Sequence, residues 1–246
     1  MKEAYIIDGI RTPIGSYKGT LSPVRTDDLG ALVISEVVKR NPSIPKEAYD
    51  DVIMGCANQA GEDNRNVARM SLLLAGYPET VPGTTINRLC GSGMDAVGSA
   101  ARAIRAGDTD LMIAGGAESM SRAPFVIGKA ESAFGRTPKM FDTTMGWRFI
   151  NKKLDKQYGT DPMPKTAENL AKEYSISRED QDEFAYNSHM KALKALEENK
   201  FQDQIVPIEV EETYVDENGK KANRKFTVTK DEGPRKGTSK EALAKL

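Results

Sequence analysis

The sequence predicts a layered α/β fold, in which a mixed but mostly parallel sheet is covered by helices on both faces, followed by a mixed α+β domain. Strand and helix patterns alternate through the first 119 residues, in the order expected for parallel strands joined by crossover helices. The composition then changes. Residues 1–119 hold 14 of the 21 glycines and 27 charged side chains, whereas residues 120–246 hold 44 charged side chains. We therefore predict two domains, 1–119 and 120–246.

Four strands and three helices are predicted in the first domain. Short apolar or β-branched runs indicate strands at 4–8, 51–56, 84–86 and 110–114. Helical spacing of apolar residues predicts helices at 26–40, from residue 64 or 66 to 75, and from just after Cys90 to Gly107. Ligands of such sheets bind beyond the carboxyl ends of the strands, which is where Cys90 lies.

The second domain has fewer strand signals and more charge. Residues 124–147 show weak periodicity and are predicted to be a loop, followed by short helices at 149–157 and 166–174. Ser177 and Asp180 form a capping box that opens a long helix to about residue 199. Strands at 205–214 and 225–229 flank a hairpin turn at 216–219, and Ser239 caps a last helix at 240–246.

Cys90 is the strongest candidate for a reactive residue. It follows a strand, precedes a helix, and is succeeded by Gly91 and Gly93, which permit a tight turn and leave the thiol uncrowded. The positive end of the helix dipole favours the thiolate, which is the nucleophilic form. The alternative is a buried cysteine that packs as a small apolar side chain. The strand–turn–helix context favours the nucleophile, by the same logic as the nucleophile elbow of hydrolases.

Composition excludes several other classes of protein. The net charge of −1 gives no global field for nucleic acid, and no apolar run approaches the 18 residues of a membrane span. Cys56 and Cys90 form neither a disulfide framework nor a zinc motif, so we expect no metal and a reducing, cytoplasmic location. The single histidine, His189, lies on a charged helix and is expected to be a surface or boundary residue. The basic residues of 220–236 could either meet phosphates or form a solvated face.

Several motifs together resemble the thiolases, the acetyl-CoA acyltransferases. The sequence Asn-Arg-Leu-Cys-Gly-Ser-Gly at 87–93 resembles their nucleophile motif. Residues 6–15 resemble their opening strand and turn, and residues 114–121 resemble the exit into their loop domain. Residues 163–171, 177–182 and 231–235 are similar to loop-domain signatures. The resemblance spans the chain in the right order and is greatest to thiolases of the 3-oxoadipyl-CoA type.

The resemblance implies roles for five residues. Cys90 would accept the acyl group from an acyl-CoA thioester. Arg235 matches an arginine near the adenine and phosphates of CoA, Leu243 and Leu246 match apolar walls of the CoA site, and Met163 matches a methionine of the acyl channel. Acetyl-CoA and acyl-CoA would be substrates, and no cofactor is implied. Pro162 stands where biosynthetic members often have a histidine, so that contact is absent.

The same resemblance implies that the matched region is only part of a thiolase. In the family, the last element of the N-terminal domain and a second α/β repeat follow the position of Leu246. That half supplies the histidine that activates the nucleophile, a second cysteine and most of the oxyanion hole. We therefore expect an unpaired sheet edge, an apolar docking face, and poor activity of this chain alone.

Three hypotheses for function follow. The first is an acyltransferase of CoA-dependent pathways such as fatty acid metabolism, forming or cleaving 3-ketoacyl-CoA by Claisen chemistry through an acyl-Cys90 intermediate. The second is a non-catalytic or vestigial CoA-binding half that needs a complementary C-terminal chain. The third, a ketoacyl-synthase-like or redox cysteine protein, shares the nucleophile but not the loop-domain motifs. The family resemblance also implies a homo-oligomer.

Overall fold

A computed structural model describes residues 2–246 and divides the chain into two compact units. The first unit comprises Met1–Ala123 together with Asp203–Lys230, and the second comprises Pro124–Gln202 together with Asp231–Leu246. The composition predicted one boundary after residue 119, whereas the segment Asp203–Lys230 returns to the first unit. None of the helices within residues 2–246 is both long and apolar enough to cross a membrane.

The first unit is built on a parallel sheet of three strands. These are β1 (Asp51–Gly55), β2 (Gly83–Ile86) and β3 (Met112–Gly116), arranged in the order β2-β1-β3. In the register, Val52 of β1 lies opposite Gly83 of β2 and Ile113 of β3. The predicted α/β class is confirmed, and the third strand begins two residues later than the pattern indicated.

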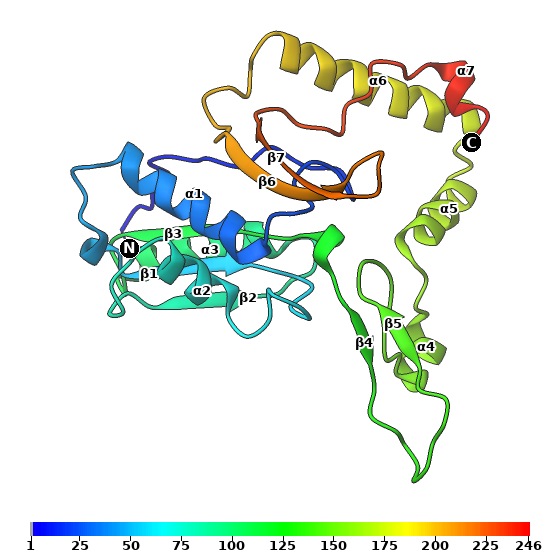
Figure 1. Cartoon of the computed structure of the whole chain (residues 1–246), viewed down its shortest axis with the longest axis horizontal. Helices are drawn as coiled ribbons and strands as arrows, with labels where there is room; N and C mark the ends of the chain where they lie inside the picture. Colours follow the sequence, from blue (N-terminus) through cyan, green and yellow to red (C-terminus); the bar gives the residue numbers. More distant parts are fainter. Residues whose placement is uncertain (1) are drawn as a thin grey trace. The chain divides into compact units, whose positions relative to one another are not determined.

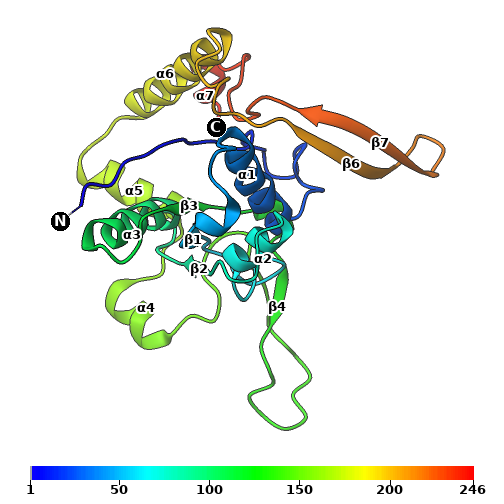
Figure 2. The same ribbon diagram turned by 90° about the vertical axis from the view of Figure 1, so that its left-hand side faces the viewer.

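Helices cover both faces of this sheet (Figures 1 and 2). Helices α1 (Thr26–Arg40) and α2 (Val67–Leu74) lie on one face, and α3 (Ser92–Ala106) lies on the other. Alternation along β1 explains the layers, because side chains of neighbouring residues point to opposite faces. The cluster between the sheet, α1, α2 and the flanking segments contains Ala31, Ile34, Tyr49, Val52, Met54, Ala68, Leu72, Ala75, Tyr77 and Val81.

Local signals set the helix ends as predicted. The Asn66 side chain accepts a hydrogen bond from the Arg69 amide and caps α2. Gly107 ends α3 with a positive φ of 90°, a conformation that glycine adopts without steric cost. The short 3₁₀ helix η1 (Lys46–Ala48) leads into β1.

The predicted strand at 4–8 is wrong. Residues 2–10 form no ladder, and the first bridge of the chain joins Arg11 to Ile205. Within the described residues β3 has β1 as its only strand neighbour, so its outer edge is open. Ile6 and Ile7 are 85% and 67% exposed, so the apolar residues of this segment are not packed against the sheet.

The hairpin of the first unit confirms the prediction for residues 205–229. Strands β6 (Ile208–Val215) and β7 (Lys221–Val228) pair antiparallel, and Gly219 takes a positive φ of 73° in the turn. The side chains that pack this hairpin against α1 and the preceding loop are Leu21, Val24, Leu29, Leu32, Ile208, Val210, Phe226 and Val228. This contact explains why the hairpin belongs to the first unit.

The second unit follows the 3₁₀ helix η2 (Met120–Arg122). The predicted loop at 124–147 is partly wrong, because β4 (Phe125–Ile127) and β5 (Met140–Asp142) form a small antiparallel ladder within it. Strands of three residues are too short to show a period. The helices are α4 (Lys152–Tyr158), α5 (Met163–Glu173), α6 (Arg178–Glu197) and α7 (Lys240–Leu243). Ser177 and Ser239 cap α6 and α7, as predicted.

Candidate functional site

Cys90 lies in the turn between β2 and α3. Strand β2 ends at Ile86, α3 begins at Ser92, and the Cys90 side chain is exposed. The neighbouring strand β1 is parallel, so the turn sits at the carboxyl end of the sheet. The thiol therefore lies directly before the N-terminus of α3, where the helix dipole has its positive end.

Hydrogen bonds fix the backbone on both sides of the thiol. The buried Ser92 hydroxyl accepts the Arg88 amide at 2.8 Å and donates to the Leu89 carbonyl at 2.6 Å. The Asn87 side chain accepts the Leu89 amide at 2.9 Å and donates to the Ala57 carbonyl at 3.0 Å. These contacts tie the turn both to itself and to the end of β1.

Leu89 carries backbone strain directly before the nucleophile candidate. Its φ is +49°, in the left-handed region that branched side chains rarely adopt. Such conformations persist only where surrounding contacts impose them, and they occur often at functional sites. The Ser92 and Asn87 hydrogen bonds supply that constraint, and the Leu89 side chain itself is exposed.

Charged neighbours surround the first turn of α3. Asp95 pairs with Arg88 at 3.0 Å and with Arg102 at 3.7 Å. The two arginines are largely exposed, so these pairs contribute little stability. Their effect is local: Arg88 is held beside the turn that carries Cys90.

A second polar group occupies the ends of β1 and β3. The buried Cys56 thiol lies 3.6 Å from an Asp63 oxygen and 4.0 Å from a Glu118 oxygen. Glu118 also accepts the amides of Ala57 and Asn58, and Asp63 accepts the amides of Gln59 and Gly61. No local pattern of the sequence indicates this group, because Glu118 lies 62 residues beyond Cys56.

The chemistry of this group is that of a hydrogen-bonded thiol. Cys56, Asp63 and Glu118 offer ligand atoms within 4.8 Å of one another, as a metal site would require. Burial, reinforced by the two carboxylates, raises the pKa of Cys56 to about 12. A metal-binding cysteine must be deprotonated, and both carboxylates already accept backbone amides. The arrangement therefore favours a protonated thiol that donates to a carboxylate.

The other predicted site residues all lie in the second unit. Met163 begins α5 with its side chain 76% exposed, and Leu246 is exposed at the end of the described chain. Arg235 precedes α7, and Leu243 is the last residue of α7. Two contacts bring this segment to α6: the Arg235 amide donates to Nδ1 of His189 at 3.2 Å, and Arg178 donates to the Leu243 carbonyl.

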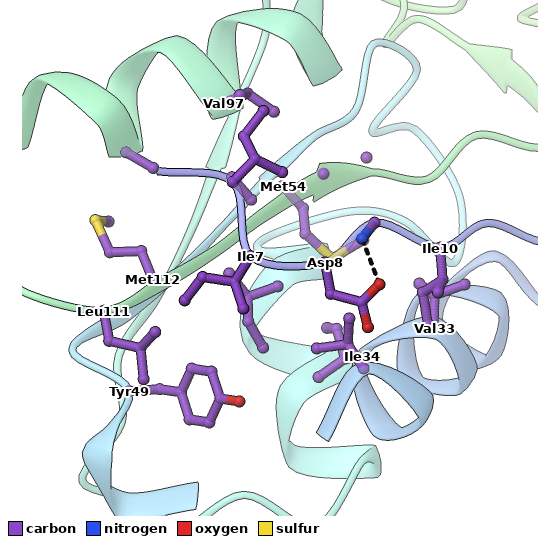
Figure 3. Close-up of a pocket in the computed structure, with 18 of the residues that line it drawn as sticks. Ile7, Asp8, Ile10, Val33, Ile34, Tyr49, Met54, Val97, Leu111 and Met112 are labelled. Atoms are coloured by element: carbon purple, nitrogen blue, oxygen red, sulfur yellow. Dashed lines mark hydrogen bonds between the residues drawn. The ribbon is translucent and has the colours of Figure 1, made fainter. Parts of the chain in front are cut away.

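A cavity of about 740 Å³ follows the open edge of β3. Val97 of α3 and Ile34 of α1 approach it from opposite faces of the sheet, and Ile7 and Asp8 of the N-terminal segment border it (Figure 3). The Asp8 carboxylate pairs with Arg40 at 3.0 Å and accepts a hydrogen bond from the Gly9 amide. Cys90 does not line this cavity, which is a gap between the extended N-terminal segment and the open outer edge of β3.

Comparisons with known proteins agree on one family. The family model described as "Thiolase, N-terminal domain" matches residues 4–246. The beta-ketoadipyl-CoA thiolase of Acinetobacter baylyi is 56% identical over 246 residues, which are all of this chain and 59% of that protein. The 3-oxoadipyl-CoA/3-oxo-5,6-dehydrosuberyl-CoA thiolase of Escherichia coli is 64% identical over 208 residues, 85% of this chain and 52% of that protein.

A solved structure supports the same relationship. The crystal structure of the Bacillus anthracis acetyl-CoA acetyltransferase aligns with a TM-score of 0.83 and 37% identity. The alignment covers 96% of this chain and 56% of that one. The chain thus spans a little over half the length of the relatives that it matches.

Proposed function

The chain belongs to the thiolase family, and on that premise we propose that it is the nucleophile-bearing part of an acyltransferase that forms or cleaves 3-ketoacyl-CoA. The observation that carries this proposal is the position of Cys90, an exposed thiol between β2 and the N-terminus of α3. The 3-oxoadipyl-CoA type of acyl chain is supported by the names of the relatives described above.

The proposed reaction begins with the Cys90 thiolate. It attacks the carbonyl carbon of an acyl-CoA thioester, a C–S bond to Cys90 forms, and the bond to the CoA sulfur breaks, releasing CoA thiolate, which takes up a proton. This covalent step divides one difficult transfer into two easier ones. In the condensing direction, the α-carbon of the acetyl-CoA enolate attacks the acyl carbonyl carbon, and a C–C bond forms as the bond to the Cys90 sulfur breaks. In the cleaving direction, the Cys90 thiolate instead attacks the keto carbon C3 of 3-ketoacyl-CoA, the C2–C3 bond breaks, and the leaving enolate takes up a proton to give acetyl-CoA. The thiolate of a second CoA then attacks the acyl group and displaces the Cys90 sulfur.

Binding of the CoA moiety is assigned to the second unit. Arg235 is exposed, and none of the ion pairs within residues 2–246 involves its guanidinium, which is therefore available to a phosphate. Leu243 and Leu246 would contact the adenine and pantetheine as apolar walls, and Met163 would line the acyl path. We propose these four roles from the family resemblance.

A specific observation favours the second hypothesis, that this chain needs a complementary C-terminal part to turn over. Its one histidine, His189, bonds to the Arg235 amide and lies in a different unit from Cys90. The open edge of β3 and the apolar cavity beside it supply a surface that an added strand could cover. The longer relatives contain the additional sequence that this proposal requires.

We also propose a location and a state of assembly for the protein. Two free cysteines and bacterial thiolase relatives support a reducing, cytoplasmic environment. Exposed apolar side chains on α3, including Met94 at 82%, support burial against another part of the protein or another copy. We propose a homo-oligomer on that basis.

The test is incubation of the 246-residue chain with acetyl-CoA, followed by intact mass measurement. We expect a slow acetyl adduct on Cys90 that is absent from Cys90→Ser, and protection of Cys90 from iodoacetamide by CoA. Absence of both the adduct and the protection would refute the nucleophile. If addition of a C-terminal thiolase half raises turnover, the second hypothesis is supported.

A further inference from the structure

Helix α6 holds the segment that carries Arg235. The imidazole Nδ1 of His189 accepts the Arg235 amide at 3.2 Å. Arg178 donates to the Leu243 carbonyl at 2.5 Å, and Lys240 pairs with Glu183 at 3.4 Å. Arg178 and His189 are eleven residues apart, close to three helical turns, so they project from the same side of α6. One face of α6 therefore contacts both ends of the segment 235–243.

The His189 contact requires a neutral imidazole. Only an unprotonated ring nitrogen accepts a hydrogen bond, so the proton of the neutral ring must be on Nε2. The contact is also to the backbone of Arg235, which leaves the guanidinium free to reach a ligand. The hydrogen bond to His189 restricts where the Arg235 side chain begins, because a fixed peptide plane limits the positions of the Arg235 Cα and Cβ atoms.

We propose that His189 is a positioning residue for CoA, acting through the backbone of Arg235. The inference deepens the proposed function and rests on the assignment of Arg235 to the CoA phosphates. It gives the only histidine of the chain a role that the sequence analysis did not predict. Without the Nδ1 acceptor, the segment at 231–239 samples more conformations, and the guanidinium loses its preset orientation before CoA arrives.

The distinguishing variants are His189→Asn and His189→Leu. The asparagine side-chain oxygen can occupy the place of Nδ1 and still accept the Arg235 amide, whereas leucine keeps side-chain volume but removes the acceptor. Asn187→Leu, at an exposed neighbour on the same helix, is the matched control for replacing a polar side chain with leucine. A double-mutant cycle is completed by the single variant Arg235→Ala and by the double variant that also carries His189→Leu.

Two measurements on the full chain separate the outcomes: the Kd for CoA, and hydrogen exchange of amides 231–239. We expect His189→Leu to weaken CoA binding by about 3- to 10-fold and to speed Arg235 amide exchange by a similar factor, the range for loss of one hydrogen bond. His189→Asn should bring the Kd for CoA and the Arg235 amide exchange rate close to their wild-type values. In the Arg235→Ala background, His189→Leu should weaken CoA binding very little.

The inference is overturned if His189→Leu leaves Arg235 amide exchange and CoA affinity at wild-type values. It is also overturned if the losses of CoA binding free energy in His189→Leu and Arg235→Ala add up to the loss in the double variant. It is also overturned if His189→Asn is as impaired as His189→Leu. Failure of the proposed function has a different signature. In that case wild type and Arg235→Ala would bind CoA equally, or neither would bind, while the exchange data would still decide whether His189 holds the Arg235 amide.

Discussion

A β-carbon placed on Gly55 would lie 2.3 Å from the backbone carbonyl carbon of Ser92. Gly55 is the last residue of β1 and Ser92 is the first residue of α3, so the helix begins in direct contact with the strand. The same β-carbon would lie 2.4 Å from the Gly93 amide nitrogen. The absence of a side chain at residue 55 thus sets the position of the turn that carries Cys90.

Gly55→Ala should destabilise the first unit and displace the Cys90 turn. The added methyl group meets backbone rather than a flexible side chain, so α3 must move, and we expect a loss of about 3 kcal/mol. Gly115→Ala on β3 is the control, because a β-carbon there meets nothing within 4 Å. Urea unfolding should give a lower free energy of unfolding for Gly55→Ala than for Gly115→Ala. Equal free energies would show that α3 moves aside without loss of stability.

The two cysteines should differ sharply in alkylation. Cys90 is exposed at a helix N-terminus, whereas Cys56 is 1% exposed and its pKa is raised to about 12. Iodoacetamide at pH 7.5 should therefore modify Cys90 first, by at least about 100-fold in rate, since only the thiolate reacts. Peptide mass mapping against time measures both rates, and preferential modification of Cys56 would contradict the assignment.

Ser92→Ala should loosen the turn without removing the thiol. The variant leaves the Arg88 amide without its acceptor and the Leu89 carbonyl without its donor, a cost of about 1–3 kcal/mol. Leu89 should then relax from its positive φ, and the alkylation rate of Cys90 should change. Ser188→Ala, at an exposed position on α6, is the control. An unchanged alkylation rate in Ser92→Ala would mean that Ser92 contributes stability alone.

Stability should fall in alkaline solution because of Cys56. Its pKa rises from 9.0 in an unperturbed thiol to about 12, so above pH 9 the unfolded chain loses a proton that the folded chain keeps. The contribution is fully present below pH 9 and is lost as pH rises towards 12, by up to about 1.4 kcal/mol per pH unit.

The control for this pH dependence is Cys56→Ala. Burial also raises the pKa of Tyr49 and of Tyr77, so the tyrosines add an alkaline loss of the same sign in both proteins. Unfolding free energies measured from pH 7 to pH 10.5 should therefore fall more steeply in wild type than in Cys56→Ala. Parallel curves would show that the Cys56 thiol ionises in the folded protein as readily as in the unfolded chain.

The sequence predicted the elements whose signals are local. Helix α1 follows from apolar spacing, the end of α3 from Gly107, the start of α6 from Ser177, and the β6–β7 hairpin from its turn residues. Each signal acts over at most a few turns of chain. The motif around Cys90 also belongs to this class, because a strand, a thiol and a helix start are contiguous at 84–93.

The tertiary structure decided what depends on partners far along the chain. Residues 4–8 have the composition of a strand but no ladder partner, because strand pairing requires a second edge within hydrogen-bonding distance. The thiol of Cys56 meets Glu118, 62 residues away, and His189 meets Arg235, 46 residues away. Sequence periodicity reports which side of an element is buried but not which element covers it. The candidate nucleophile could therefore be chosen from the sequence, whereas the side chains around it and the contact between α6 and Arg235 depend on the tertiary structure.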